Sequence, residues 1–350
     1  MLAAAVFFPI QARAVSARRA YVLDALSGRV LFERSAYERS LIASTTKIMT
    51  ALVVCEQCNV LDRVRIPKEA VGIEGSSMYL REGEVLTVQD LLYGLMLRSG
   101  NDAAVALAIY CGGTVEGFAE LMNSKAHRLG LTGSHFVNPH GLDNPNHYST
   151  ARDLAVLSSY AMENPIFAQT VSTRTVTAGQ RQLVNHNKLL WQLEGADGVK
   201  TGFTKAAGRI LVSSCSRQER RLIAVTIDDG NDWTDHKKLL ESGFSEFTLQ
   251  QIVRAGDCLA TLEVISADEQ SVELIALEDF SYPLRSDETL QVVIPGPGFV
   301  YAPVVEGQKA GIAYLYLGDK IVGQIPLEYG STAEQLPDEK VPFLKRIFGR

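Results

Sequence analysis

The sequence predicts an α+β fold in which an antiparallel sheet with helices and a helical insertion is followed by a small all-β domain. Three observations support this prediction. Strand patterns occur near the start of the chain and again around residues 198–227, with helix patterns between them. Beyond about residue 252, short alternating runs are separated by Pro, Gly and Asp. The length of 350 residues also exceeds that of one average domain.

The composition is that of an ordinary folded protein, with 46% hydrophobic and 21% charged residues. A net charge of −6 argues against nucleic acid as a partner. Five cysteines are present, and we expect small buried thiols. Cys55 and Cys58 form a C-x-x-C inside a helix pattern, without the strand-to-helix turn of a redox motif. A zinc site would need further paired ligands, so we expect no metal.

Residues 1–14 resemble a secretory signal peptide. An apolar run over residues 2–10 precedes Ala12-Arg13-Ala14, which has the small-residue pattern of a cleavage site. The usual Lys or Arg before the apolar run is missing, as expected for a signal peptide truncated at its start, and the alternative is a buried N-terminal strand. No later stretch reaches the roughly 18 apolar residues of a membrane span. We therefore expect an exported protein.

The first domain is expected over residues 15–250. Strands at 20–24 and 29–33 flank Ser27-Gly28, which predicts a hairpin. Helix patterns then occupy residues 44–59, 91–97, 102–111, 116–129 and 150–160. Residues 135–147 have the composition of a loop, and residues 174–184 are typical of extended chain. The domain closes with strands at 198–203, 210–214 and 221–227 and a helix at 234–249.

The second domain is expected to be all-β, over residues 251–330. Its clearest signal is Gly318-Asp319, a turn between the alternating runs 312–317 and 321–325. A tail over residues 331–350 follows. Its last nine residues, 342–350, combine basic side chains with one apolar face, which predicts a short amphipathic membrane anchor. The alternative is a frayed polar terminus.

Ser44 and Lys47 are the first candidate catalytic residues. They are three residues apart in a helix pattern, so their side chains share one face. A serine hydroxyl needs a base to become a nucleophile, and a lysine can serve only if its pKa is lowered by burial or a second cation. No other serine here has a lysine three residues on. The alternative is a serine N-cap with a solvated lysine.

Two further motifs follow in order. Ser99-Gly100-Asn101 lies in a turn between two helices, and Lys200-Thr201-Gly202 lies at the end of a strand. Alone, the first is ordinary turn chemistry and the second an edge hairpin with a solvated lysine. Together, S-x-x-K, S-x-N and K-T-G form the trio of penicillin-binding proteins and class A β-lactamases.

The chain resembles the D-alanyl-D-alanine carboxypeptidases, which are low-molecular-weight penicillin-binding proteins with a β-lactamase/transpeptidase-like fold. The resemblance runs from residue 20 to the final β domain. Besides the trio, it rests on residues 42–50, 99–103, 138–142, 147–150 and 197–204.

The resemblance implies a catalytic role for Ser44, Lys47 and Ser99. Ser44 would attack the carbonyl between the two terminal D-alanines of a peptidoglycan stem peptide. Lys47 would take its proton, and Ser99 would relay it to the leaving D-alanine. Backbone N–H groups of Ser44 and Phe203 would form the oxyanion hole.

The resemblance also implies which residues bind substrate. Asn101 would hydrogen-bond the substrate amide, and Lys200 and Thr201 would hold the terminal carboxylate. Gly202 would let the substrate lie against the strand as an added β-strand. Some relatives carry an arginine after the final strand, where this chain has the acidic stretch 228–232. Carboxylate recognition then rests on Lys200 and Thr201 alone, or on Arg209.

The implied partners are stem peptides and β-lactam antibiotics, with no cofactor, at the outer face of the cytoplasmic membrane or in the cell wall. Class A β-lactamases carry, between the second and third motifs, an E-x-x-x-N run whose glutamate activates the deacylating water. This chain is not expected to be one, because no glutamate between Asn101 and Lys200 has Asn four residues later. The second motif is also Ser-Gly-Asn rather than Ser-Asp-Asn. A non-catalytic penicillin or glycan sensor is disfavoured by the intact Ser44, Lys47 and Lys200. Endopeptidase action on cross-links would use the same residues and stays open.

Overall fold

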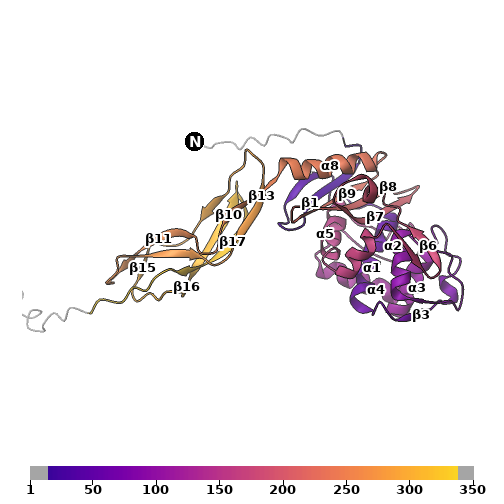
Figure 1. The fold of residues 1–350 in the computed structure, drawn as a ribbon, viewed down its shortest axis with the longest axis horizontal. Helices are drawn as coiled ribbons and strands as arrows, with labels where there is room; N and C mark the ends of the chain where they lie inside the picture. Colours follow the sequence, from indigo (N-terminus) through magenta and orange to yellow (C-terminus); the bar gives the residue numbers. More distant parts are fainter. Residues whose placement is uncertain (1–14, 338–350) are drawn as a thin grey trace, which may run out of the picture. The chain divides into compact units, whose positions relative to one another are not determined.

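The computed structural model describes residues 15–337, and the chain divides into two compact units between Ser245 and Glu246 (Figure 1). The signal-like segment (residues 1–14) and the anchor-like segment (residues 342–350) lie outside the described residues. Among the described residues, no single helix is long and apolar enough to cross a membrane. Two consecutive helices, α3 (Asn101–Gly112) and α4 (Val115–Arg128), meet that criterion only as a pair bent by 82°.

The first unit is built on a five-stranded antiparallel sheet of order β2-β1-β9-β8-β7. Its two N-terminal strands are paired to the three late strands, so chain segments about 200 residues apart form one sheet. This confirms the predicted sheet with a helical insertion. The strands are β1 (Arg19–Asp24), β2 (Val30–Arg34), β7 (Ala196–Thr204), β8 (Gly208–Arg217) and β9 (Arg220–Ile227).

Helices cover both faces of this sheet. On β9, Thr226 faces α8 and bonds His236 of that helix, whereas Ile223 and Val225 join the core formed with the other helices (Figure 1). This follows from the alternation of side chains along a strand. The helices are α1 (Lys47–Gln57), α2 (Val88–Leu97), α3 (Asn101–Gly112), α4 (Val115–Arg128), α5 (Ala151–Ala161), α6 (Pro165–Ser172), α7 (Leu189–Gln192) and α8 (Asp232–Glu246).

Shorter elements complete the first unit. The 3₁₀ turn η1 (Ala43–Thr46) leads directly into α1, so the predicted helix begins as a tighter turn. A second 3₁₀ turn is η2 (Lys68–Ala70). Two small hairpins pair β3 (Arg63–Arg65) with β4 (Val85–Thr87), and β5 (Thr175–Ala178) with β6 (Arg181–Val184).

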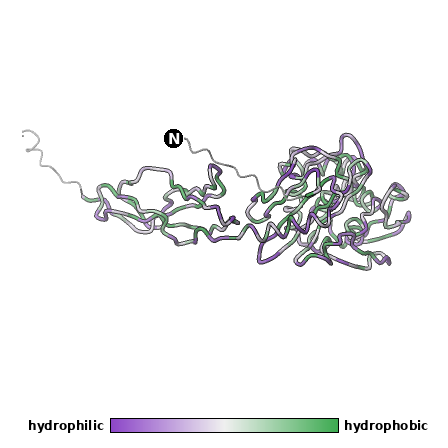
Figure 2. The backbone as a smooth tube through the Cα atoms, turned by 90° about the horizontal axis from the view of Figure 1, so that it is seen from above, coloured by the Kyte–Doolittle hydropathy of each residue, from purple (hydrophilic) through white to green (hydrophobic). Residues whose placement is uncertain are grey.

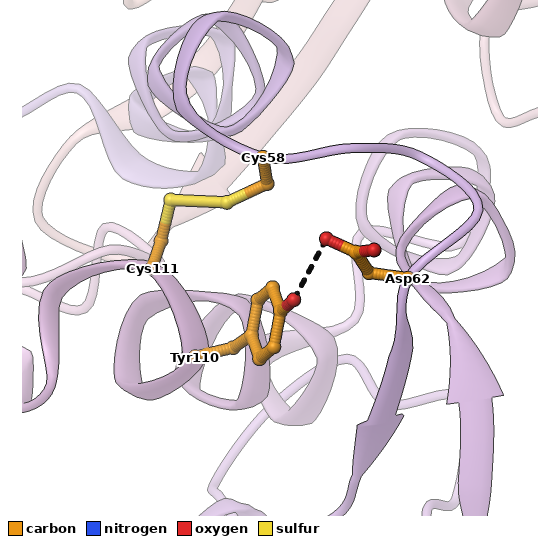
Figure 3. Close-up of a disulfide and its surroundings, with 4 residues drawn as sticks. All are labelled: Cys58, Asp62, Tyr110 and Cys111. Atoms are coloured by element: carbon orange, nitrogen blue, oxygen red, sulfur yellow. Dashed lines mark hydrogen bonds between the residues drawn. A yellow bond between two sulfur atoms is a disulfide. The ribbon is translucent and has the colours of Figure 1, made fainter.

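The cysteines differ from expectation. Cys58, at the end of α1, forms a disulfide with Cys111, in the last turn of α3 (Figure 3). The prediction of buried thiols is therefore wrong for this pair and for the exposed Cys258, whereas Cys215 is buried. The partners are 53 residues apart in sequence, and only the packing of α1 against α3 brings their Cα atoms to 6.6 Å. Local periodicity carries no signal for such a contact.

The second unit is rich in strands. It has a six-stranded sheet of order β14-β16-β17-β12-β11-β15 and a separate β10-β13 pair. Hydrophobic and hydrophilic stretches are interspersed along the backbone of this unit (Figure 2). The bounds are β10 (Thr248–Val253), β11 (Cys258–Ile265), β12 (Ser271–Ala276), β13 (Phe280–Leu284), β14 (Gln291–Val293), β15 (Phe299–Tyr301), β16 (Lys309–Leu317) and β17 (Lys320–Tyr329).

Two predictions concern this unit: the hairpin around Gly318 and the end of the helix that precedes the unit. The hairpin around Gly318 is confirmed, since β16 and β17 pair on either side of it and Gly318 has φ of +59°. The helix predicted for residues 234–249 is too long. It ends at Glu246, because Thr248 and Leu249 pair with Leu284 and Pro283 of β13. Strand pairing overrides the local helical period there.

Candidate active site

Ser44 and Lys47 lie at the junction of η1 and α1. Ser44 is in the 3₁₀ turn, Lys47 is the first residue of α1, and Lys47 Nζ is 2.9 Å from Ser44 Oγ. The lysine side chain has no exposed surface. The structure therefore brings a hydroxyl and a buried amine into direct contact.

Two carbonyl oxygens complete the surroundings of Lys47. Its Nζ donates to Asn101 Oδ1 at 2.7 Å and to the His140 carbonyl oxygen at 2.7 Å. The loop carrying His140 is held on α1, where Thr50 Oγ1 donates to Pro139 O at 2.6 Å. A neutral amine has two N–H donors and one lone pair. With both donors used by carbonyl oxygens, the lone pair is left for the proton of Ser44.

The orientation of the Asn101 amide follows from its other bonds. Asn101 Nδ2 donates to Glu74 O at 2.5 Å, and its backbone N–H donates to Ser76 O at 2.7 Å. Because the amide nitrogen faces a carbonyl, the amide oxygen faces Lys47. The next residue, Asp102, is buried and accepts the N–H groups of Met78 and Leu80, which fixes the same segment.

The electrostatics favour a neutral Lys47. Burial, with a second contribution from Lys200, lowers the pKa of Lys47 well below its usual value, and Asp102 opposes this. Burial also lowers the pKa of Lys200 to about 7. His140 and His147 beside Lys47 are neutral as well, since burial first and nearby charges second lower their pKa values to about 3 and about 4.

Strand β7 supplies the K-T-G motif. Lys200 is buried and donates from Nζ to the Thr201 carbonyl oxygen at 3.0 Å. Gly202 lies against η1, where an added Cβ would be 3.3 Å from both Ile42 O and Ser44 N. Glycine therefore allows the strand to approach the turn that carries Ser44.

An open cavity of about 380 Å³ joins these elements. Five of the predicted site residues line it, whereas Lys47, Asn101 and Lys200 are buried and are not part of its lining. The cavity is lined by Ser44, Ser76, Ser99, His186, Lys188, Thr201, Gly202, Phe203, Arg209, Ile210, Asp232 and Trp233. Sequence reasoning did not propose Ser76, His186, Lys188 or Ile210 as site residues. No local pattern marks them, and they emerge only once the strand order is known.

Arg209 and Asp232 form an ion pair in this lining. Arg209 Nη2 donates to both Asp232 carboxylate oxygens at 2.8 Å, and Nε donates at 3.1 Å. The Arg209 side chain is 44% exposed, against 5% for Asp232. Among the described residues, Arg209 Nη1 has no partner. The acidic stretch after β9 thus orients an arginine on β8 and leaves one guanidinium edge free.

Between residues 15 and 337, no group of three His, Cys, Asp or Glu side chains is arranged to hold a metal ion.

Comparison with known families identifies the chain. Residues 7–231 match the peptidase family described as D-alanyl-D-alanine carboxypeptidase, and residues 247–335 match the C-terminal domain of penicillin-binding protein 5. The chain belongs to the D-alanyl-D-alanine carboxypeptidase family. Within it, this chain is a low-molecular-weight serine penicillin-binding protein.

Individual relatives agree. The D-alanyl-D-alanine carboxypeptidase DacF of Bacillus subtilis is 30% identical over 349 residues, which cover 95% of this chain and 89% of DacF. DacC of Escherichia coli is 34% identical over 338 residues, 91% of this chain and 84% of DacC. The crystal structure of penicillin-binding protein 5 from Haemophilus influenzae superposes with a TM-score of 0.79 at 30% identity. That match covers 93% of this chain and 100% of the other.

Proposed function

We propose that this chain is a serine-type D-alanyl-D-alanine carboxypeptidase that removes the terminal D-alanine from peptidoglycan pentapeptide stems through an acyl-enzyme on Ser44. It is also expected to bind penicillin there. The observation that carries the proposal is the environment of Lys47: two carbonyl acceptors, one hydroxyl and a lowered pKa. A lysine held in this way is a base rather than a cation.

In acylation, the Ser44 hydroxyl gives its proton to Lys47 Nζ as Oγ bonds the carbonyl carbon of the penultimate D-alanine. The carbonyl oxygen becomes an oxyanion that accepts hydrogen bonds from the backbone N–H groups of Ser44 and Phe203. The carbon–nitrogen bond then breaks, and the leaving nitrogen takes a proton relayed from Lys47 through Ser99. Water hydrolyses the ester in a second step and restores the Ser44 hydroxyl.

Substrate is held from both sides of the cavity. Lys200 and Thr201 bind the terminal carboxylate, and a bound carboxylate favours the ammonium form of Lys200. The free Nη1 edge of Arg209 adds a second cation on the same wall. Asn101 bonds the substrate amide, and Gly202 lets the peptide lie against β7.

We assign the catalytic and substrate-binding residues to the domain at residues 15–250. The peptidoglycan substrate lies outside the cytoplasm. We therefore propose that residues 1–14 direct export and that the C-terminal tail contacts the outer face of the cytoplasmic membrane.

Two measurements test this function. Mass spectrometry of a pentapeptide incubated with the protein should show loss of one D-alanine. A fluorescent penicillin should label the protein, and tryptic mapping should place the adduct on the peptide that contains Ser44. Labelling that survives Ser44→Ala would exclude Ser44 as the nucleophile.

A further inference from the structure

A second cavity, of about 510 Å³, shares a chain segment with the active site. Ser76 lines the active-site cavity, whereas Met78 and Tyr79, two and three residues on, line the second one. The remaining lining comes from the same segment and from the β5–β6 turn: Arg81, Glu84, Gly179, Gln180 and Arg181. The two cavities are therefore neighbours along the chain.

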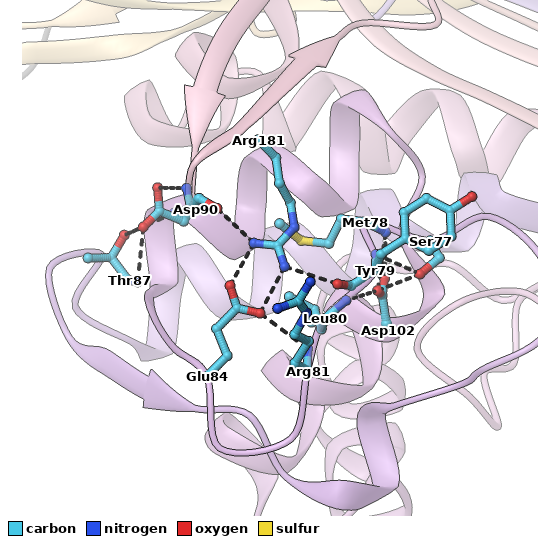
Figure 4. A network of polar contacts seen from close by, with 11 residues as sticks. Ser77, Met78, Tyr79, Leu80, Arg81, Glu84, Thr87, Asp90, Asp102 and Arg181 are labelled. Carbon is cyan, nitrogen blue, oxygen red and sulfur yellow. Dashed lines mark hydrogen bonds and ion pairs between the residues drawn. The ribbon is translucent and has the colours of Figure 1, made fainter.

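The wall of the second cavity is tightly held (Figure 4). Arg181 donates to Glu84 Oε1 at 2.6 Å and Oε2 at 2.8 Å, and to Tyr79 O at 3.0 Å. From the other side, buried Asp102 accepts the Met78 N–H at 3.1 Å. The segment is thus pinned between the β5–β6 turn and α3. Its shape is built by these bonds.

Tyr79 presents its ring to solvent from this wall. The residue is 79% exposed, and its backbone has φ of +60°, which is rare for a tyrosine. The conformation is fixed by Ser77 Oγ, which accepts the Tyr79 N–H at 2.8 Å, and by Arg181. In the free protein this backbone conformation buries little of the Tyr79 side chain, so burial does not offset its strain. Strain of this kind at an exposed aromatic residue points to a binding role.

The charge of the cavity limits its ligand. Arg181 is neutralised by Glu84, but among the described residues the Arg81 guanidinium has no hydrogen bond or ion pair. One cation without a hydrogen-bonded partner does not suit a polyanion, and the charged side chains among the lining residues do not suit a wholly apolar ligand. An exposed aromatic face, a guanidinium and the Gln180 amide together match a sugar ring. The apolar face of the sugar stacks on the tyrosine, and its hydroxyl and acetamido oxygens accept hydrogen bonds.

We propose that this second cavity binds the amino-sugar end of the same substrate, the N-acetylated saccharide to which the stem peptide is attached. The proposal rests on the proposed function. Ser76 and Tyr79 are three residues apart, so their Cα atoms are within about 11 Å. The four stem residues on the sugar side of the scissile bond span up to about 14 Å when extended. This exceeds the Ser76–Tyr79 separation, so a peptide whose scissile bond lies in the cavity shared by Ser44 and Ser76 can extend along this segment toward Tyr79.

The test compares two substrates, a free pentapeptide and the same peptide carrying an N-acetylated disaccharide. For the sugar-bearing substrate, Tyr79→Ala and Arg81→Ala should each lower kcat/KM by about tenfold. The free peptide and the rate of penicillin acylation should be unaffected. Tyr79→Phe keeps the ring and should behave as wild type, as should Tyr301→Ala, which removes a tyrosine 67% exposed in the second unit.

Equal losses on both substrates would mean that the variants only disturb the active-site wall, and no loss on either would mean that the sugar is not bound. Either result overturns the proposal. Binding of the disaccharide-pentapeptide to Ser44→Ala protein, measured by calorimetry, separates this from the proposed function. Tyr79→Ala in that background should weaken binding by about tenfold even if wild type fails to cleave the peptide. Unchanged affinity would again overturn the proposal.

Discussion

The first unit buries Lys47, Lys200 and Asp102 around its cavity, whereas every buried side chain described in the second unit is hydrophobic. Both units are folded around apolar clusters, so the difference is not one of packing. It lies in what else is placed in the interior. Burying a charged group costs several kcal/mol unless the group is paired, hydrogen-bonded or neutralised.

The first unit therefore carries the free-energy cost of burying charged groups, and it does so at the candidate active site. Lys47 is kept inside by two carbonyl acceptors and a lowered pKa, which are the properties a base requires. The second unit, with no such group among residues 246–337, follows the usual rule for a β core. The rate of penicillin acylation is the measurement that tests this contrast between the two units.

Lys47→Arg should cause the largest change. Arginine keeps the positive charge but does not give up a proton at accessible pH, so the lone pair that accepts the Ser44 proton is lost. We expect acylation to fall by about 10³-fold or more. Stopped-flow acylation by a fluorescent penicillin measures this, with thermal unfolding as the control for folding. Acylation at nearly the wild-type rate would mean that another group, such as Ser99, accepts the proton.

The pH profile of acylation should give the next largest effect. Protonation of Lys47 removes the reactive form, so the rate should fall about tenfold per pH unit on the acid side and level off as pH rises. Because burial and Lys200 lower the pKa of Lys47, the plateau should begin well below the ordinary lysine value of about 10.4. The apparent pKa belongs to the coupled Lys47–Lys200 pair. A midpoint near 10.4 would contradict a neutral Lys47.

The sequence predicted features that depend on the local spacing of residues. It did not predict contacts that depend on tertiary packing. The i, i+3 spacing of Ser44 and Lys47 was enough to predict their contact. The strand and helix patterns predicted the sheet and its helical insertion, and the trio of motifs indicated the family. By contrast, the His140 carbonyl is a backbone atom with no side-chain signal, and the Cys58–Cys111 disulfide depends on how α1 packs against α3. Neither can be predicted from periodicity.

Asp102→Asn should have an intermediate effect. The carboxylate accepts bonds from Ser77 Oγ and the N–H groups of Met78 and Leu80, whereas an asparagine has one acceptor oxygen and an NH₂ that faces donors. The segment that orients Asn101 should loosen, and acylation should fall about tenfold. Loss of the negative charge should also move the apparent pKa downward, because Asp102 raises the pKa of Lys47. A slower rate with an unshifted pH profile would assign Asp102 a purely structural role.

Removal of the second unit should have the smallest effect. Every residue that lines the active-site cavity precedes Glu246, as does every buried polar side chain described. A chain ending at Glu246 should therefore be acylated within about twofold of the full-length rate, as expected for independent regions. The matched variant Leu327→Ala should destabilise the second unit by about 2–5 kcal/mol through a core cavity and leave acylation equally unchanged. Circular dichroism would confirm that the shortened chain is folded. If a folded chain of this length were not acylated, the second unit would be needed to form the active site. The catalytic function could then not be assigned to the first unit alone.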